Sequence, residues 1–356
     1  MPGVVLKAEG DGAVLGQPLL TPAAWTAADA LAHPEEWQLQ LTAQDAAEIV
    51  AVAKAAVASG KPVPEMALSD FPLPTLAAKL ELVRQSVVHG RGFYLLRGFP
   101  VEQLTRQETV AAFYGLGLYW GTPRSQNAKG HVVGHVKDLG LDAEANDVRV
   151  YATSAAQPWH VDDADLVSLL CLKRAKQGGL SGWASAATIY NRLLATRPDL
   201  IEELTKVYAF DKKGEYADGE KPFLEAPVLS VYKGNLFFFY NDKYIRQAQR
   251  FQQVPRLTAR QLEALQAVTD LANDPDLHLE YDLQPGDIQL IHNWTQLHTR
   301  TAYVDHEGFE NRRHLLRLWL SCKSGSRPIN PEVFPKQAYL GVPPVDGILK
   351  APLDAE

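Results

Sequence analysis

Apolar positions along the chain follow two periods, and each period predicts its own kind of element. Steps of three and four residues, which are typical of amphipathic helices, recur in several segments. The predicted helices cover residues 43–58, 75–88, 106–119, 186–195, 199–207 and 258–272. Between them, short β-rich or alternating runs predict strands. The predicted strands cover residues 92–99, 130–136, 148–153, 166–174, 228–232, 236–240, 277–283, 288–292 and 314–322.

This order of elements favours a mainly β fold. Many short strands separated by turn signals, such as Pro285-Gly286-Asp287, are typical of a barrel or a two-sheet jelly roll with a few helices. A parallel nucleotide-binding sheet is disfavoured, because neither glycine-rich phosphate motif is present. The first 40 residues are rich in proline and are expected to be irregular and to wrap around the body. We therefore expect an extension over residues 1–75 and one functional unit over residues 76–356.

Composition narrows the class of protein. The chain is 46% hydrophobic and 22% charged, close to globular averages, so it can form a sizeable core. Its net charge is −7 and it has no strongly basic run, which argues against a nucleic-acid partner. Cys171 and Cys322 lie in apolar runs and are expected to be reduced thiols, which fits the cytoplasm. No secretion signal or membrane-length apolar stretch is visible.

His160-Val161-Asp162 is a candidate half of a metal site. Two imidazoles and one carboxylate on one face of a metal form the ligand set of non-haem iron oxygenases. Side chains at i and i+2 of an extended segment point to the same side, so His160 and Asp162 can bind one ion. The spacing alone is weak evidence, since the composition supplies roughly one such pair by chance. Three pairs occur, at His33/Glu35, His160/Asp162 and His278/Glu280.

Sequence context separates these three pairs. His33 lies in the irregular N-terminal stretch and is better explained by a helix or turn start. His278 lies in an alternating strand whose polar face is more simply solvated. His160 ends a loop and leads into the apolar strand LVSLLCL, and the mouth of a barrel is where small-molecule sites form. A third ligand is expected in IQLIHNWTQLHTRTAY, where the residues alone leave His292 and His298 nearly even.

The run RHLLRLWL adds two arginines on one strand face. Arg313 and Arg317 are four residues apart, and the alternation of a strand places them on the same side. Arg317 is enclosed by leucines and Trp319, and a buried guanidinium needs a hydrogen-bonded partner. An internal salt bridge would meet that need, and so would a carboxylate of a bound 2-oxo acid. Thr188 offers a hydroxyl to the same carboxylate, although a helix-start role explains it equally well.

Four blocks stand in this order between about Gly92 and Cys322: GFYLLRGFP, QPWHVDDADLVSLLCLKRAKQGGLS, QPGDIQLIHNWTQLHTRTA and RRHLLRLWLS. Together they resemble the taurine dioxygenase and clavaminate synthase-like branch of the Fe(II)/2-oxoglutarate oxygenases. The resemblance implies a double-stranded β-helix (jelly roll) with flanking helices, and Fe(II), 2-oxoglutarate and O2 as cofactors. The ligand and cofactor residues that it implies are His160, Asp162 and His298 for the metal, and Arg317 for 2-oxoglutarate, supported by Arg313 and Thr188.

The implied activity is decarboxylation of 2-oxoglutarate to succinate and CO2, coupled to O2-dependent oxidation of a small molecule. Hydroxylation is the default outcome, and desaturation or ring closure is compatible with the same site. Asp162 argues against halogenation, because halogenating relatives replace this carboxylate by a small residue. A non-catalytic jelly-roll binding protein and a zinc hydrolase are the alternatives. The combination of Asp162 with Arg317 favours the oxygenase, since a zinc hydrolase needs no carboxylate clamp.

The substrate site is the least defined part of the sequence. Gln157 and Trp159 flank His160, and Asn127 lies on an earlier loop, so these three are candidate substrate contacts. Packing or turn roles explain them equally well. The segment FFFYNDKYIRQAQRF departs from the resemblance, because relatives often carry an arginine at or near Asn241. A small polar or amino-acid-like substrate is what the resemblance implies.

Overall fold

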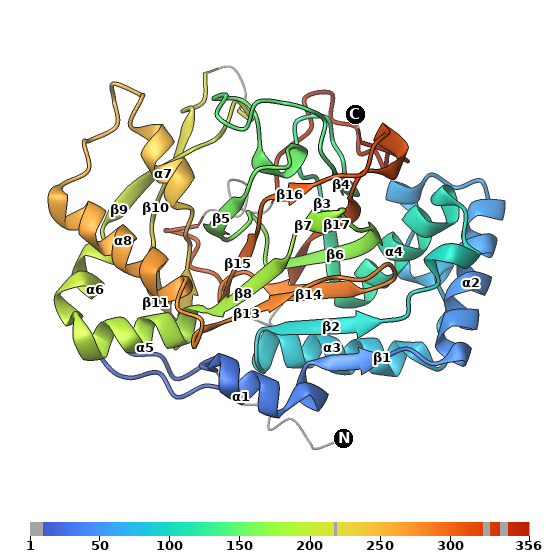
Figure 1. Cartoon of the computed structure of the whole chain (residues 1–356), viewed down its shortest axis with the longest axis horizontal. Coiled ribbons are helices and arrows are strands. Elements are labelled where there is room, and N and C mark those ends of the chain that lie inside the picture. The colour runs from blue at the N-terminus through green and yellow to red at the C-terminus, as the bar shows by residue number, and fades with distance from the viewer. Residues whose placement is uncertain (1–9, 217–218, 323–327, 335–340, 356) are drawn as a thin grey trace.

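Two facing β-sheets form the centre of the molecule in the computed structural model, which describes residues 10–216, 219–322, 328–334 and 341–355 (Figure 1). The larger sheet has the strand order β1-β2-β14-β6-β17-β3, with β4 also paired to β17. Its strands are β1 (Gln38–Gln40), β2 (Phe93–Arg97), β3 (Gly121–Arg124), β4 (Gly134–Val136), β6 (Leu166–Lys173), β14 (Ile288–His292) and β17 (His314–Cys322). The smaller sheet has the order β13-β8-β15-β5. Its strands are β5 (Gln157–His160), β8 (Ser181–Ser185), β13 (His278–Tyr281) and β15 (Gln296–Arg300).

Aromatic side chains fill the space between the two sheets. Phe93 of the larger sheet stacks on Trp183 of the smaller one, with ring centroids 5.2 Å apart, and Trp319 lies in the same buried cluster. Burying such large rings is the main favourable contribution to sheet packing. This arrangement is the double-stranded β-helix that the sequence predicted. Shorter strand pairs complete the fold: β7 (Gln177–Gly178) with β16 (Tyr303–Val304), β9 (Val207–Asp211) with β10 (Phe223–Pro227), and β11 (Leu229–Tyr232) with β12 (Asn235–Phe238).

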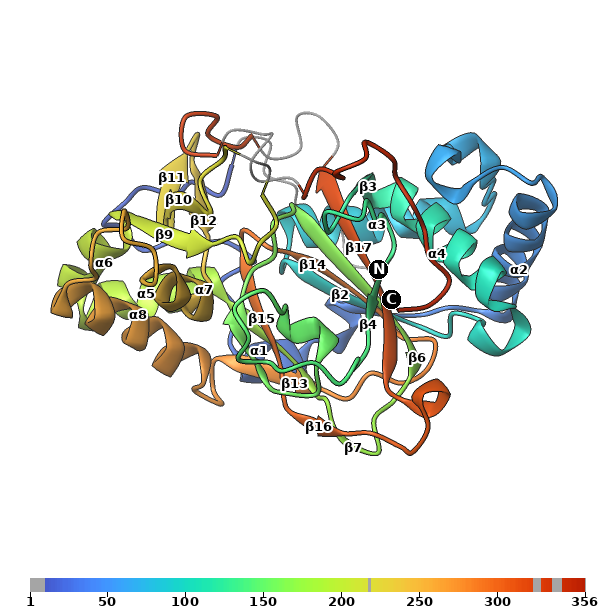
Figure 2. The same ribbon diagram turned by 90° about the horizontal axis from the view of Figure 1, so that it is seen from above.

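Helices cover the sheets on two sides, as both ribbon views show (Figures 1 and 2). One group packs on the larger sheet and consists of α2 (Ala43–Ala58), α3 (Leu76–His89) and α4 (Arg106–Trp120). The other side carries α5 (Ala186–Thr196), α6 (Pro198–Leu204), α7 (Asp242–Ala248) and α8 (Ala259–Ala272). The short helix α1 (Ala27–Ala32) lies near the described N-terminal end. Capping boxes begin three of these helices, at Thr42/Asp45, Thr105/Glu108 and Thr258/Gln261.

The predicted helices all form within a few residues of their expected bounds, but one predicted strand is wrong. Residues 148–153 contain a 3-10 turn, Val150–Ala152, because the backbone bonds to itself: Ala152 N donates to Arg149 O at 3.0 Å. The segment before residue 40 is also less irregular than expected, since β1 pairs in parallel with β2. The division of the chain at residue 75 stays a prediction.

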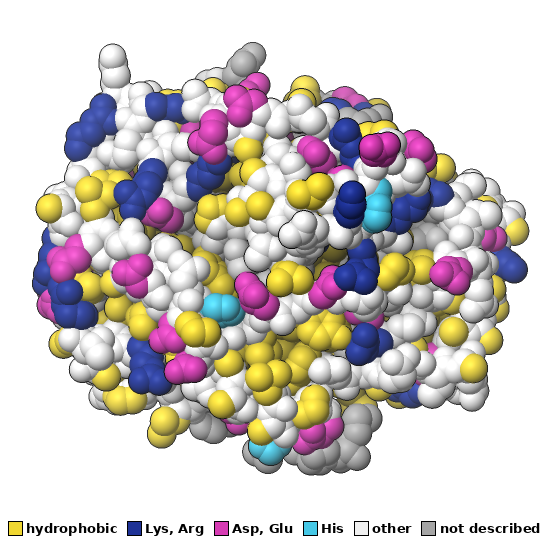
Figure 3. Space-filling view, viewed as in Figure 1, with side chains coloured by type: hydrophobic (Ala, Val, Ile, Leu, Met, Phe, Trp, Pro, Cys, Tyr) yellow, Lys and Arg dark blue, Asp and Glu magenta, His cyan; other side chains and the backbone are white. Residues whose placement is uncertain are grey.

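Among the described residues, no helix combines the length and the apolar character needed to cross a bilayer. On the face shown in Figure 3, acidic and basic side chains are interspersed rather than gathered by sign.

Candidate active site

His160, Asp162 and His298 come together although 138 residues separate the two histidines in the sequence. Strand β5 pairs with β15 so that His160 lies directly opposite His298. Their donor atoms and those of Asp162 all lie within 4.8 Å of one another. Asp162 Oδ1 is 3.6 Å from His160 Nε2, and its Oδ2 is 3.9 Å from His298 Nε2. All three side chains are buried, so the pairing of two strand ends builds a compact N/N/O donor set.

The surroundings of this donor set shift the pKa values of Asp162 and His298. Burial by itself would raise the pKa of Asp162, but Arg317 and the two imidazoles hold it well below its usual range. Burial, followed by the neighbouring His160, lowers the pKa of His298 and keeps its ring neutral. His160 Nδ1 lies 2.9 Å from Pro158 O, a contact that orients the ring with Nε2 toward Asp162. A charged carboxylate with two imidazole nitrogens beside it is a ligand set that fits a divalent metal of the Fe(II) type.

Arg317 stands next to this donor set and is already held by two partners. Its Nη1 is 3.3 Å from Asp162 Oδ2, and its Nε donates to Gln126 Oε1 at 2.7 Å. Trp319 also donates to Asp162 Oδ2, at 2.8 Å. The guanidinium of Arg317 therefore belongs to the wall around the Asp162 carboxylate.

A small cavity between the two sheets is lined by the three residues of the donor set. Arg300 and Arg313 also line it. The guanidinium of Arg313 donates through Nη2 to Gly179 O at 3.2 Å. Arg300 donates through Nη2 to Thr153 O at 3.0 Å and also to Ala155 O. Burial, and then the nearby Arg313, lower the pKa of Arg300 to about 10. Two buried guanidiniums on one cavity make it suited to an anion.

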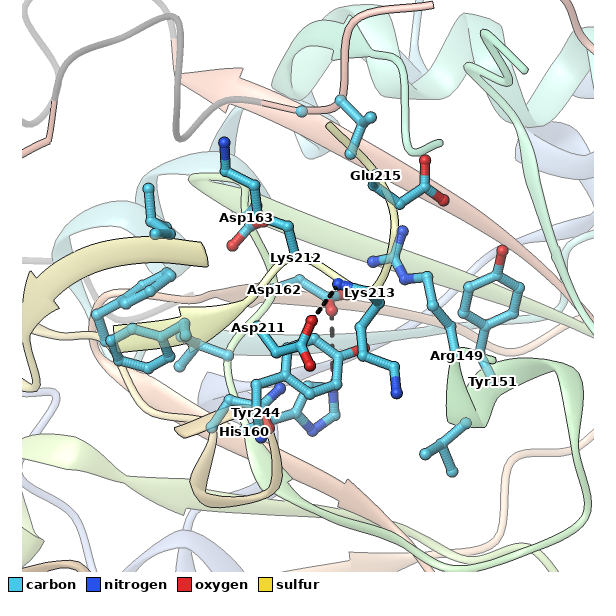
Figure 4. A pocket seen from close by; sticks show the side chains of 18 of the residues that line it. Arg149, Tyr151, His160, Asp162, Asp163, Asp211, Lys212, Lys213, Glu215 and Tyr244 are labelled. Atoms are coloured by element: carbon cyan, nitrogen blue, oxygen red, sulfur yellow. Dashed lines mark hydrogen bonds and ion pairs between the residues drawn. The ribbon is translucent and has the colours of Figure 1, made fainter. Parts of the chain in front are cut away.

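A larger cavity of about 350 Å³ opens on the other side of His160 and Asp162. Figure 4 shows charged groups of both signs on its wall, among them Arg149, Lys213 and Glu215. Tyr151 and Tyr244 add aromatic surface, and Arg317 lines both cavities. Arg149 lies over the ring of Tyr151, with Cζ 5.4 Å from the centroid. The size and mixed lining suit a small polar molecule.

Of the other residues that the sequence predicted to contact 2-oxoglutarate or the substrate, only some line these cavities. Gln157 lines both, and its Nε2 is 2.8 Å from His160 Nε2. Thr188 lines neither and donates its hydroxyl to Trp25 O at 2.7 Å, in the first turn of α5. Trp159 donates to Asn273 Oδ1 at 2.8 Å, outside both linings. Asn127 instead contacts His131, with its Oδ1 3.2 Å from His131 N.

His292, the rival third ligand, is buried in β14 with its Nδ1 3.1 Å from Thr295 Oγ1. It lines neither cavity, so its position is that of a core residue.

The sequence reasoning missed several cavity residues. Arg300 had a usable signal, because it stands two positions after His298 on the same strand and so faces the same way. Arg149 and Lys213 had none, since each enters the larger cavity from an irregular segment.

Comparison with known proteins places this geometry in a family. The sequence pattern of the "Taurine catabolism dioxygenase TauD, TfdA family" matches residues 59–319. FR-33289 synthase of Streptomyces rubellomurinus is 31% identical over 318 residues, which are 88% of this chain and 93% of that protein. The chain belongs to the TauD/TfdA family. The taurine hydroxylase-like protein SAT17 of Stachybotrys chartarum is also similar to this TauD/TfdA protein. It is 34% identical over 298 residues, which are 80% of this chain and 75% of that protein.

Solved structures agree on the fold of this TauD/TfdA protein. Asparagine oxygenase in complex with Fe(II), hydroxyasparagine and succinate superposes with a TM-score of 0.62 and 19% identity, covering 80% of this chain and 93% of that chain. The non-haem iron oxygenase OrfP with Fe and α-ketoglutaric acid gives 0.60 and 15%, covering 80% and 94%. The protein is an Fe(II)- and 2-oxoglutarate-dependent dioxygenase that uses O2 and acts on a small molecule.

Proposed function

We propose that this oxygenase binds one Fe(II) through the imidazoles of His160 and His298 and the carboxylate of Asp162. The observation that carries the proposal is the convergence of these three side chains within 4.8 Å, from strand ends far apart in the sequence. The charged carboxylate of Asp162 beside the neutral imidazole of His298 supports a divalent metal. Gln157 must turn away when the metal binds, because its amide lies 2.8 Å from His160 Nε2.

We propose that 2-oxoglutarate occupies the smaller cavity, with its 2-oxo acid end at the metal and its far carboxylate at Arg313. Arg313 lines the same cavity as the three proposed metal ligands, and its Nη1 has no hydrogen-bond partner among the described residues, so it can receive the far carboxylate of a diacid bound at the metal. Arg317 is already engaged by Gln126 and Asp162. Arg313 thus takes the main role that the family resemblance had implied for Arg317. The cavity measures about 30 Å³, so binding must move the side chains that fill it.

The larger cavity is proposed to hold the substrate, a small polar molecule, with hydroxylation as the default reaction. Fe(II) and 2-oxoglutarate, when bound, would activate O2, which is the oxidant, and 2-oxoglutarate would be converted to succinate and CO2. The residues of the chain position the reactants and exclude water. Tyr151, Tyr244 and Arg317 enclose the space beside Asp162 for this purpose.

The cytoplasm is the compartment that we propose. Its support is that the buried Cys171 is not part of a disulfide, as expected where disulfides are reduced.

The metal proposal is tested with anaerobic protein, Fe(II) and 2-oxoglutarate. We expect a weak visible metal-to-ligand charge-transfer band from the chelate. His160→Ala and His298→Ala should abolish the band, because each removes one of three protein ligands. His33→Ala is the matched control, since His33 has the same spacing to an acidic residue but lies half-exposed at the surface. A wild-type protein without the band, or an unchanged band in His160→Ala, would refute the proposed site.

The substrate proposal is tested by succinate release across a panel of metabolites, since coupled turnover reports the substrate directly. Compounds of a size and polarity that suit the larger cavity should stimulate release. Stimulation only by large apolar compounds would contradict the assignment of this cavity.

A further inference from the structure

Two arginines approach the inner end of the smaller cavity from opposite sheets. Arg300 lies on β15 of the smaller sheet, two residues after His298, so the alternation of the strand points it into the same space. Arg313 lies just before β17 of the larger sheet, on the same face as Arg317. The two sheets thus place one guanidinium on each side of the space that leads from the metal ligands.

Both guanidiniums keep buried donors without a partner. Arg300 is 5% exposed and Arg313 is 4% exposed. Arg300 Nε and Nη1 and Arg313 Nη1 have no hydrogen-bond partner among the residues that the structure describes. The bonds that they do make go to neutral backbone carbonyls of Thr153, Ala155 and Gly179. Leaving such charged donors unsatisfied in the interior is costly, which points to a missing anionic acceptor.

Tyr303 holds the two arginines near each other. The Cζ of Arg300 lies 4.8 Å from the centroid of the Tyr303 ring, and that of Arg313 lies 5.3 Å from it. The Tyr303 hydroxyl is buried and also has no partner within the described part of the chain. Two like charges against one ring repel each other, so a single carboxylate between them would relieve the repulsion and satisfy the free donors.

We propose that Arg300 joins Arg313 in a two-arginine site that grips the far carboxylate of 2-oxoglutarate from both sheets. This inference rests on the proposed position of 2-oxoglutarate in the smaller cavity. It makes Arg300 a binding residue for the co-substrate and gives the site a preference for 2-oxo acids with a second carboxylate. Since His298, the proposed metal ligand, and Arg300 both lie on β15, this one strand would contact both the metal and the far carboxylate.

The test compares two ligands that differ only in the far carboxylate, namely 2-oxoglutarate and 2-oxopentanoate. Their affinities for the anaerobic Fe(II) protein are measured by titrating the charge-transfer band. Arg300→Gln should weaken 2-oxoglutarate binding at least about 10-fold, the scale of a lost charge-assisted hydrogen bond, and change 2-oxopentanoate binding little. Arg300→Lys keeps the charge without the planar fork and should show a smaller loss of the same selectivity.

Arg312→Gln is the matched control, because Arg312 neighbours Arg313 and donates to a backbone carbonyl, Asp138 O, at 2.7 Å, but lies outside the cavity. It should leave both affinities unchanged. Equal losses for the two ligands in Arg300→Gln would mean that Arg300 only tethers the loop before β5, and would overturn the inference. If Arg300→Gln does not fold, Arg300→Lys decides by the same ratio. A wild-type protein that gives no band at all would overturn the proposed function, and this inference with it.

Discussion

Gln126 organises the cationic wall beside the proposed metal ligands. Its side-chain amide accepts a hydrogen bond from Arg317 Nε at 2.7 Å and donates one to the backbone oxygen of Arg317 at 2.8 Å. The backbone oxygen of Gln126 accepts from Arg149 Nη1 at 2.6 Å. A carboxamide can do this because it carries a donor and an acceptor on one plane. Arg317 is therefore fixed in place without any ligand, whereas Arg313 retains a free donor.

This difference predicts that substitution of Arg313, just before β17, and of Arg317, within β17, will have distinct effects on ligand binding. Arg313→Gln should weaken 2-oxoglutarate binding at least about 10-fold, since a charge-assisted carboxylate contact is lost. Arg317→Gln should weaken it less and instead change Fe(II) affinity, because Arg317 contacts the ligand Asp162. Titration of 2-oxoglutarate and of Fe(II) by calorimetry under anaerobic conditions separates the two effects. A greater loss of 2-oxoglutarate affinity in Arg317→Gln than in Arg313→Gln would mean that Arg317 is the main contact of the far carboxylate, as the family resemblance implied.

At the scale of elements, helix α4 lies very close to its neighbours because it carries glycines in its interior. A Cβ at Gly115 would stand 2.3 Å from the Phe71 ring, and one at Gly117 would stand 2.6 Å from Leu318 Cδ1. Glycine inside a helix normally costs about 1 kcal/mol relative to alanine. The close packing against the larger sheet offsets that cost.

Gly115→Ala should therefore destabilise the protein by about 1–3 kcal/mol, although helix propensity alone predicts a gain of about 1 kcal/mol. The reason is that the Phe71 ring would have to leave its buried position. Denaturant unfolding measures the change. Gln107→Ala on the exposed side of the same helix serves as the control and should stay within about 0.5 kcal/mol of the wild type. A stabilised Gly115→Ala would show that the helix can shift without loss of packing.

Across the whole molecule, the C-terminal segment 341–355 links distant parts of the chain. Its start lines the larger cavity, where Gly341 N donates to Asp163 O at 3.0 Å. Its end meets a buried histidine pair: His135 Nε2 lies 2.9 Å from Pro352 O, and His135 Nδ1 lies 2.8 Å from His314 Nε2. The cavity wall and this histidine pair are thus joined by one stretch of backbone.

The histidine pair makes stability sensitive to acid. Burial lowers the pKa of His135 from 6.5 to about 4 and also lowers the pKa of His314. The charged groups that face the pair are Arg106 of α4, Lys137 and Asp354, together with the nearby His131. The unfolded chain takes up a proton near pH 6.5, whereas folded His135 resists protonation until about pH 4. Stability should therefore fall as the pH drops from about 6.5 to about 4, by up to about 3 kcal/mol.

Unfolding by urea at several pH values measures this dependence. His135→Gln should make the slope between pH 6.5 and pH 4 less steep, since one of the two titrating rings is gone and only His314 remains. His33→Gln replaces a half-exposed histidine and should leave the slope as it is. An equal slope in His135→Gln and the wild type would mean that other groups govern the acid sensitivity.

Local patterns in the sequence were sufficient for much of the fold. The three- and four-residue apolar periods placed the helices, because helix hydrogen bonds form within one segment. The apolar runs of β6, β14 and β17 were also visible, since each strand is buried along its length. The strand predicted at residues 148–153 is absent because a strand forms only where a partner strand pairs with it.

The sequence by itself therefore determined the helices and the long buried strands and, with the family resemblance, the two-sheet class and the candidate ligands His160, Asp162 and His298. It did not predict β5, β8 and β15, which form most of the smaller sheet. Only the tertiary structure decided which residues meet. Strand pairing set His298 opposite His160, and the facing of two sheets set Arg300 opposite Arg313. It also removed Thr188, Trp159 and Asn127 from the cavities, because each bonds to a neighbour elsewhere. Contacts between residues far apart in the sequence depend on register and sheet packing, and no local pattern carries that information.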